Sequence, residues 1–172
     1  FNEGGIEARL LDWYRNMDRS KIQFYIIKLN NVTSDKMLEI EKLGGKFYNV
    51  TPFTPHTFIK YIKQISHIIK EINPDILHIH SFSTGIFPLT IAKKEGIKAR
   101  IIHSRTTDYL PNEKNKTIKK FLKKYTPKFA TDYFACSKNA GKWGIGEKYN
   151  VKIINNGITL ELFEFNKTTR NE

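Results

Sequence analysis

Short runs rich in Ile, Val, Tyr and Phe alternate with longer segments of helical periodicity along most of the chain. Where strands and helices alternate in this way, each helix packs back on the sheet, and the strands it joins run parallel with helices on both faces. We therefore predict an α/β protein built on a Rossmann-like parallel sheet. The predicted strands are residues 22–29, 46–50, 76–80, 99–104, 132–137 and 151–155.

Several segments between these strands have the apolar stripe of an amphipathic helix. The clearest is residues 58–72, whose stripe stops before the helix-breaking pair Asn73-Pro74. A further apolar helix is expected over residues 84–94, with Gly96 closing it. The first predicted helix presents one apolar face, made of Ile6, Leu10, Trp13 and Met17.

The two ends of the chain bear on its domain organisation. A sheet of this class usually has a central first strand ahead of the first helix, whereas only Phe1, Asn2 and Glu3 precede the two glycines here. We expect this first strand to be missing. Residues 1–163 are expected to form one Rossmann-like domain, and the polar residues 164–172 a linker or tail.

Composition indicates the cellular compartment of the chain and the charge of its partner. It has one cysteine, Cys136, and neither a signal-peptide pattern nor an apolar run long enough to span a membrane, so we expect a cytoplasmic protein. The net charge of +12 implies an anionic partner. Charge alone leaves open a nucleic acid, a phosphorylated ligand or an anionic membrane surface.

Gly4 and Gly5 stand at the predicted N-terminus of the first helix. Glycine lets backbone N–H groups approach a ligand closely, and the helix dipole favours an anion there, so this turn suits a phosphate or a sugar hydroxyl. The alternative is a tight strand-to-helix turn that holds no ligand.

Two histidines lie on one side of the strand at residues 76–80, His78 within it and His80 at its carboxyl end before Ser81. Ligands of open α/β sheets bind beyond the carboxyl ends of the strands, so we predict a binding role for His80 and Ser81. His78 lies deeper and is expected to be a hydrogen-bonded core residue. A metal site needs a third ligand from the same pocket, and no Cys or His cluster of metal spacing supplies one, so we predict no metal.

The next strand ends in His103, Ser104 and Arg105, followed by further hydroxyl side chains. Two adjacent strand ends that each carry a histidine would form a polar rim suited to sugar hydroxyls or a phosphate. The alternative is a rim whose polar groups satisfy one another without any ligand.

Residues 115–128 are strongly basic and predict an amphipathic helix whose pattern Pro127 breaks. Its lysine face either lies against anionic lipid headgroups or is the solvated outer face of a helix that covers the sheet. No aromatic stacking platform or nucleic-acid motif accompanies these lysines, so we expect no nucleic-acid partner. The apolar face is Ile118, Phe121, Leu122 and Tyr125, and the lysine face is Lys116, Lys119, Lys120, Lys123 and Lys124.

With these residues placed, the chain resembles the family 4 retaining glycosyltransferases of the GT-B fold, particularly those that build bacterial capsular and exopolysaccharides. The order and spacing of five motifs carry the resemblance through nearly the whole chain. They are Gly4-Gly5-Ile6-Glu7 with Leu11-Asp12-Trp13-Tyr14-Arg15-Asn16, Asp75-Ile76-Leu77-His78-Ile79-His80, Ile102-His103-Ser104, Phe134-Ala135-Cys136-Ser137-Lys138 and Ile154-Asn155-Asn156-Gly157-Ile158.

The resemblance implies that residues 1–163 are the N-terminal, acceptor-side half of a two-domain enzyme, and that residues 164–172 lead toward a C-terminal donor-binding domain. Such an enzyme transfers a sugar from a nucleotide-sugar donor, commonly a uridine diphosphate sugar, to an acceptor hydroxyl with retention of configuration. The acceptor is expected to be a saccharide, typically lipid-linked. No cofactor or metal is expected, and the isolated half should be inactive because the donor's main contacts lie elsewhere.

The resemblance also assigns roles to residues. His103 matches the histidine that family members place beside the reacting sugar, and Gly4 and Gly5 match the turn that approaches the donor phosphates. The acceptor-side set is His80, Ser81, Ser104 and Arg105, and Asn156 with Gly157 stands at the corner between the domains. Relatives often have a second histidine in place of Arg105 and an aspartate in place of Thr159.

Together these inferences predict a glycosyltransferase fragment of capsular or exopolysaccharide synthesis. Through its lysine face it would lie in the cytoplasm on the inner surface of the plasma membrane. The alternative function is a non-catalytic, sugar- or nucleotide-binding Rossmann-like module.

Overall fold

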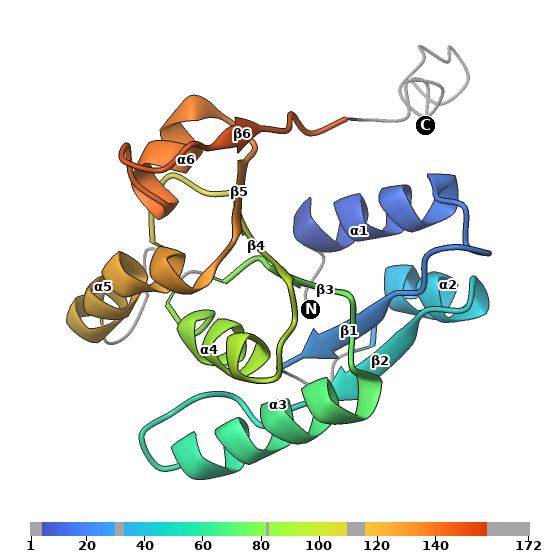
Figure 1. Ribbon diagram of the computed structural model, residues 1–172. Helices are drawn as coiled ribbons and strands as arrows, with labels where there is room; N and C mark the ends of the chain where they lie inside the picture. The colour runs from blue at the N-terminus through green and yellow to red at the C-terminus, as the bar shows by residue number, and fades with distance from the viewer. Residues whose placement is uncertain (1–4, 30–32, 82, 110–115, 158–172) are drawn as a thin grey trace, which may run out of the picture.

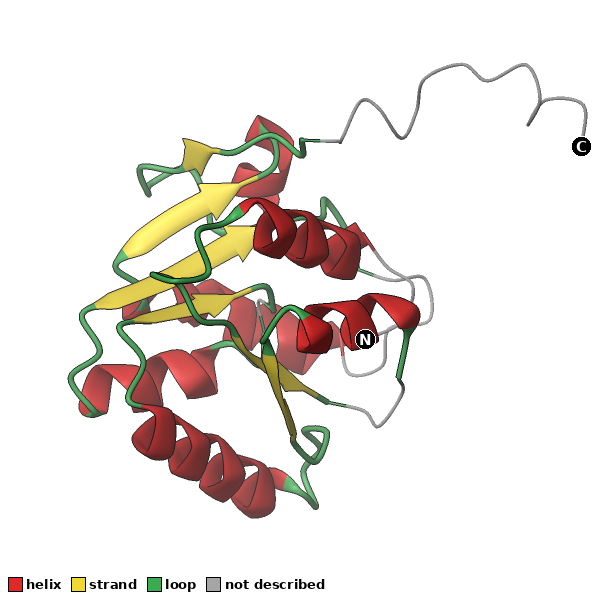
Figure 2. Cartoon of the chain, turned by 90° about the vertical axis from the view of Figure 1, so that its right-hand side faces the viewer, coloured by secondary structure: helices red, strands yellow, loops and turns green. Residues whose placement is uncertain are grey.

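The computed structural model of this chain describes residues 5–29, 33–81, 83–109 and 116–157 (Figures 1 and 2). Strands and helices alternate within these residues, as predicted. The strands are β1 (Tyr25–Lys28), β2 (Lys46–Asn49), β3 (Ile76–Ile79), β4 (Ala99–Ser104), β5 (Asp132–Ala135) and β6 (Lys152–Ile153). The helices are α1 (Gly5–Asn16), α2 (Asp35–Lys42), α3 (Phe58–Ile72), α4 (Ile86–Lys94), α5 (Lys116–Tyr125) and α6 (Lys138–Gly144), with a 3₁₀ turn at Thr126–Phe129.

All strand pairs among the described residues are parallel, but they form two sheets rather than one. Strands β3, β4, β5 and β6 pair in chain order, while β1 pairs only with β2. No hydrogen-bonded ladder joins β1 to β3 in the part of the chain that the structure describes. Residues 1–4, ahead of α1, lie outside the described part of the chain, so the expectation of a missing first strand stays a prediction.

Helices cover the strands from both sides. Figure 1 shows α1 and α2 on one side and α3 and α4 on the other, with α5 and α6 beside the four-stranded sheet. The α3 stripe packs with α4 in a core that contains Tyr61, Ile65 and Ala92. A second core, which contains Leu89 and Ile102, joins α4 to β4. The layered arrangement confirms the predicted α/β class.

Most predicted element positions are confirmed, and their ends follow local chemistry. Helix α3 stops at Ile72 because Asn73 adopts a left-handed conformation, with φ of 43°, and donates its backbone N–H to the Ile69 carbonyl. Gly96 closes α4 with φ of 80°, which glycine adopts without strain. Helix α2 was not predicted individually, although the Ser34 side chain caps it by accepting from the Met37 N–H.

The predicted apolar face of α1 is wrong by a rotation about the helix axis. The buried residues are Glu7, Leu11 and Tyr14, whereas Ile6 is 36% exposed. Leu11 and Tyr14 pack with β1 and α2, so the helix turns toward the two-stranded sheet. This rotation leaves Trp13 only partly buried, at the border of that core.

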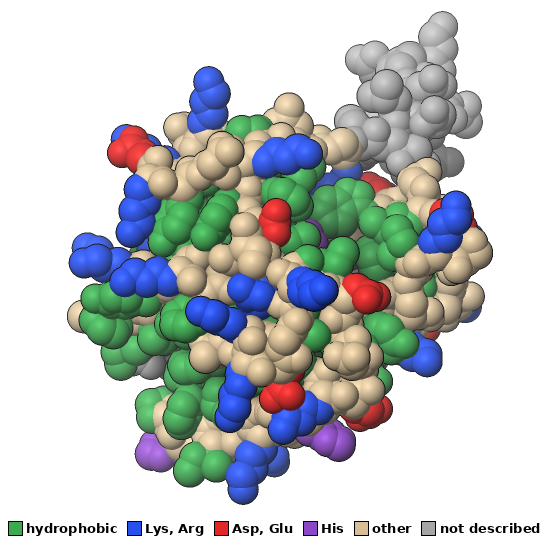
Figure 3. All heavy atoms as spheres, in the orientation of Figure 1, with side chains coloured by type: hydrophobic (Ala, Val, Ile, Leu, Met, Phe, Trp, Pro, Cys, Tyr) green, Lys and Arg blue, Asp and Glu red, His purple; other side chains and the backbone are tan. Residues whose placement is uncertain are grey.

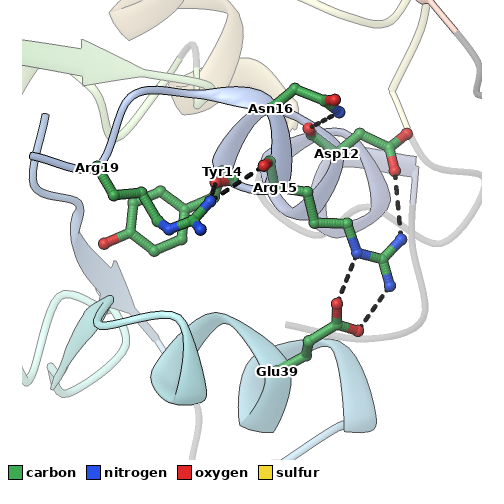
Figure 4. A network of polar contacts seen from close by, with 6 residues as sticks. All are labelled: Asp12, Tyr14, Arg15, Asn16, Arg19 and Glu39. Atoms are coloured by element: carbon green, nitrogen blue, oxygen red, sulfur yellow. Dashed lines mark hydrogen bonds and ion pairs between the residues drawn. The ribbon is translucent and has the colours of Figure 1, made fainter.

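An ion pair fixes α1 against α2 at the surface (Figure 4). The Arg15 guanidinium donates from two nitrogens to the two carboxylate oxygens of Glu39, each at 2.6 Å, and also lies 3.8 Å from Asp12. Both side chains are about 40% exposed, so the pair contributes orientation more than stability. It helps to hold the helix that carries Trp13.

Candidate functional site

Three histidines meet at the carboxyl ends of β3 and β4. His78 lies in β3, His80 follows that strand, and His103 is the penultimate residue of β4. The β3–β4 register pairs Ile79 with Ile102, so His80 is level with His103 by continuation. Because side chains alternate along a strand, all three imidazoles point to the same face of the sheet.

The imidazoles are in direct contact with one another. The Nε2 atom of His78 lies 3.2 Å from Nδ1 of His103, a hydrogen bond whose donor depends on the tautomer. Those two rings are parallel within 3°, and the His78 and His80 ring centroids are 4.4 Å apart. We call this group the histidine cluster: His78, His80 and His103.

Aromatic side chains and one arginine enclose the histidine cluster. Trp13 of α1 stacks beside His78 and His103 at centroid distances of 6.0 and 6.1 Å, and Phe134 of β5 meets both rings edge-on. The Arg105 guanidinium lies 4.8 Å from the Trp13 ring centroid. The site therefore combines apolar walls with one partly buried positive charge.

Burial keeps all three histidines neutral at physiological pH. It lowers the pKa of His78 to about 4, of His80 to about 2 and of His103 to about 3, because an imidazolium would lose its hydration. The Arg105 charge contributes to all three pKa shifts, and the neighbouring imidazoles contribute to those of His80 and His103. Burial also lowers the pKa of Arg105 itself, and Arg9 adds to that effect.

Several polar atoms at the site are buried without a hydrogen-bond partner within the described chain. They are Nδ1 of His80, Nε2 of His103 and Nε of Arg105. Buried polar groups are nearly always paired in folded proteins, so such a set marks a place that a ligand or water completes. A neutral imidazole can donate or accept, which suits a hydroxyl, and the guanidinium suits an oxyanion.

The serines of the predicted rim behave differently from the histidines. Ser81 remains at the β3 end, where its hydroxyl lies 2.8 Å from that of Thr84. Ser104 was predicted on the acceptor side, and this position is wrong. It is fully buried on the opposite face of β4 and donates to the Ala140 carbonyl of α6 at 2.5 Å. Adjacent residues of a strand point to opposite faces, so Ser104 points away from the face that carries His103.

Arg105 connects the β4 end to the segment after β6. Its Nη1 atom donates to Oδ1 of Asn156 at 2.9 Å. Asn156, predicted at the interdomain corner, thus lies beside the site, and Gly157 follows it in an exposed position. Gly5 begins α1 and is exposed, while Gly4 lies outside the described residues.

The structure changes the argument about metals. The sequence prediction of no metal rested on the lack of a third ligand, since His78 was assigned to the core. One ring nitrogen each of His78, His80 and His103 lies within 4.8 Å of the others. The ligand-count argument therefore no longer applies, because a contact between two strands supplies the third histidine.

Helix α5 carries the predicted lysine face with one exception. Lys116, Lys120 and Lys124 are exposed, whereas Lys123 turns inward, donates to the Trp143 carbonyl at 2.9 Å and lies 3.7 Å from that ring's centroid. Assigning Lys123 to a membrane-facing set was therefore wrong, because an aromatic cation site on α6 competes for its ammonium group. Lys119 is partly buried.

The apolar side of α5 is also exposed. Ile118 is 54% and Phe121 61% exposed, and Figure 3 shows hydrophobic and basic side chains next to one another over this helix. None of the helices that the structure describes is both long and apolar enough to cross a bilayer.

Comparisons with known proteins agree on one family. A family model described as glycosyl transferase 4-like matches residues 10–138. The glycosyltransferase EpsF of Bacillus subtilis (strain 168) is 31% identical over 179 residues, which cover 99% of this chain and 46% of EpsF. The capsular polysaccharide biosynthesis glycosyltransferase CapH of Staphylococcus aureus is 27% identical, covering 99% of this chain and 48% of CapH.

Solved structures show the same fold. HepE from Anabaena, in complex with UDP, superposes with a TM-score of 0.68 at 15% identity over 96% of this chain and 44% of HepE. HepE with UDP-glucose gives a TM-score of 0.66. The chain thus spans about half the length of the relatives it matches. With a GT-B glycosyltransferase fold and a family model that covers most of its residues, this chain belongs to the glycosyl transferase 4-like family.

Proposed function

We propose that this chain is the acceptor-side half of a retaining glycosyltransferase of capsular or exopolysaccharide synthesis. In this proposal the whole protein moves a hexose from a nucleotide sugar, UDP-linked, to a saccharide or lipid-linked saccharide acceptor. The reaction needs no metal or other cofactor, and nucleic acid is not a partner. The family match and the names of EpsF and CapH support the reaction class, and the HepE complexes support a UDP-linked donor.

The observation that carries the proposal is the set of unpartnered polar atoms on the histidine cluster and Arg105. A sugar presents hydroxyls that both donate and accept, and neutral imidazoles offer both functions. The apolar wall of Trp13 is suited to the carbon face of a sugar ring. The guanidinium of Arg105 adds a positive charge that suits an oxyanion at this site.

His103 is expected to act as a hydrogen-bonding group rather than as an acid or base. With a pKa of about 3 its ring is neutral at pH 7, so it is not a general acid there and is only a weak base. Its Nδ1 atom faces His78, so its Nε2 atom is the one left for a sugar hydroxyl. The bond gains strength if the hydroxyl becomes more polar in the transition state, which is how such a contact raises kcat.

The test uses the complete protein that contains this chain, with UDP-sugars as donors and lipid-linked saccharides as acceptors. Product formation is measured for the parent, for His103→Asn and for His67→Asn, since His67 is an exposed residue of α3. We expect His103→Asn to lower kcat by about 10²-fold, as removal of one transition-state donor does elsewhere. Full activity of His103→Asn, or no transfer and no hydrolysis of any UDP-sugar by the parent, would contradict the proposal.

A non-catalytic binding module is the competing function, and the isolated 172-residue chain distinguishes the two. A module should bind UDP or a simple sugar with a micromolar dissociation constant by calorimetry. The transferase proposal expects weak binding by the isolated chain, because the donor's main contacts would belong to residues outside it. Micromolar binding together with inactivity of the complete protein would favour the module.

We further propose that the protein works in the cytoplasm, on the inner surface of the plasma membrane, with α5 as the contact. Exposed Ile118 and Phe121 lie beside lysines on this helix, a combination that binds anionic headgroups. Each lysine near the surface is worth about 1 kcal/mol, so Lys116→Glu with Lys120→Glu should largely release the chain from vesicles rich in phosphatidylglycerol. Equal binding to neutral and anionic vesicles would count against this contact, and Lys63→Glu with Lys70→Glu on α3 is the matched control.

A further inference from the structure

The histidine cluster has the composition of a transition-metal site. Three imidazoles and an open fourth position are the ligand set of several catalytic zinc sites. His78, His80 and His103 each offer a ring nitrogen, and these nitrogens lie within 4.8 Å of one another. We propose that the histidine cluster binds one divalent transition-metal ion, with zinc as the probe.

One pair of nitrogens already has the spacing of two ligands on one ion. With Zn–N bonds of 2.0–2.1 Å, tetrahedral geometry separates two ligand nitrogens by about 3.3 Å. Nε2 of His78 and Nδ1 of His103 are 3.2 Å apart. These rings are parallel within 3°, so a ring rotation about χ2, which is a soft torsion, is needed to aim both lone pairs at one ion.

The third ligand is available, and side chains shelter the cluster in part. Nδ1 of His80 is buried without a partner in the described chain, and so is Nε2 of His103, which provides an alternative donor atom. His103 has no solvent exposure, and Trp13 and Phe134 flank the cluster. Imidazoles held neutral need not lose a proton to bind a metal.

The positive charge of Arg105 opposes a cation at the histidine cluster. The guanidinium stacks on Trp13, which in turn stacks on two of the histidines, and Arg9 is a second positive group near it. No carboxylate belongs to the described cluster. We therefore expect weaker binding than at a structural zinc site, and Arg105→Gln should bind zinc more tightly than the parent chain.

The inference is separate from the proposed function, whose reaction uses no metal. An ion on the histidine cluster would occupy imidazoles that the proposed function gives to the sugar, and its binding needs only the 172-residue chain. The experiment titrates zinc chloride into chelator-treated chain by calorimetry, and follows cobalt(II) by its visible absorption, which is strong only in tetrahedral sites. We expect one equivalent of zinc to bind with a dissociation constant of about 1 µM. His80→Gln and His78→Gln should each weaken binding by at least about 10-fold, the loss that even an outer-shell change causes.

The remaining two histidines of the chain provide the matched control. The double variant His56→Gln with His67→Gln keeps the cluster and should bind zinc as the parent does. Circular dichroism checks that each variant folds. If His78→Gln does not fold, His80→Gln decides the test, because His80 is partly exposed. No saturable binding at about 100 µM zinc, or equal binding by His80→Gln and the parent, overturns the inference.

Discussion

Acidification should destabilise this fold through the histidine cluster. Burial lowers the pKa of His78, His80 and His103 in the folded chain to about 4, 2 and 3, from an ordinary value of 6.5. Below pH 6.5 the unfolded chain takes up protons that the folded chain does not bind. Stability is therefore fully present above about pH 7 and falls as the pH drops from 6.5 toward 4.

The magnitude follows from proton linkage. Each histidine that stays neutral in the folded chain costs about 1.4 kcal/mol at pH 5.5, because one pH unit corresponds to about 1.36 kcal/mol per proton. The three together lower the free energy of unfolding by about 4 kcal/mol between pH 7.5 and pH 5.5. Small domains have only about 5–15 kcal/mol in total, so the loss is large.

The assay is urea unfolding monitored by circular dichroism at pH 7.5, 6.5 and 5.5, with a chelator present. His80→Gln should reduce the pH dependence by about a third. The double variant His56→Gln with His67→Gln should keep it, because neither residue belongs to the cluster. A free energy of unfolding that changes by less than about 1 kcal/mol over this range would refute the reasoning. Three histidines that stay neutral only in the folded chain must make the free energy of unfolding depend on pH.

Three further predictions concern packing and surface contacts. Gly85→Ala should lower the free energy of unfolding by about 1–3 kcal/mol, because a Cβ there would collide with the Ser81 carbonyl and lie 2.7 Å from Ile79. Gly5→Ala is the control, because a Cβ at Gly5 would meet open space, and urea unfolding measures both variants. Ser137→Ala should cost about 1 kcal/mol by removing the cap of α6, which accepts the Ala140 N–H, and Ser137→Thr should restore most of it. A double-mutant cycle with Arg15→Gln and Glu39→Gln should give a coupling below about 1 kcal/mol that shrinks in 1 M salt; a larger, salt-independent value would contradict the exposed character of the pair.

Local periodicity predicted most of the fold. The six described strands fall within the predicted runs, and α3 ends at the predicted breaker. These features depend on neighbouring residues alone, such as the Asn73-Pro74 pair that follows the stripe. The face of α1 was mispredicted because Tyr14 and Leu11 pack on α2 and β1, partners that lie distant in the sequence.

The candidate site was predicted in part. His80, His103 and Arg105 were placed at strand ends from the sequence, and the structure brings them together there. Trp13 was missed as a site residue because it was counted in an apolar stripe, although an aromatic residue at the border of a helix's buried face is a signal of such a role. Ser104 was misplaced because it follows His103 directly, and adjacent residues of a strand face opposite sides.

The sequence by itself determined the α/β class, the strand ends that carry histidines and the family to which the chain belongs. Each of these follows from short stretches of residues and from the order of those stretches along the chain. Only the tertiary structure decided that His78 joins His80 and His103, and that Lys123 turns away from its own lysine face toward Trp143. The reason is that register between parallel strands and packing between helices join residues about 20–25 positions apart, and no local pattern encodes which of them meet.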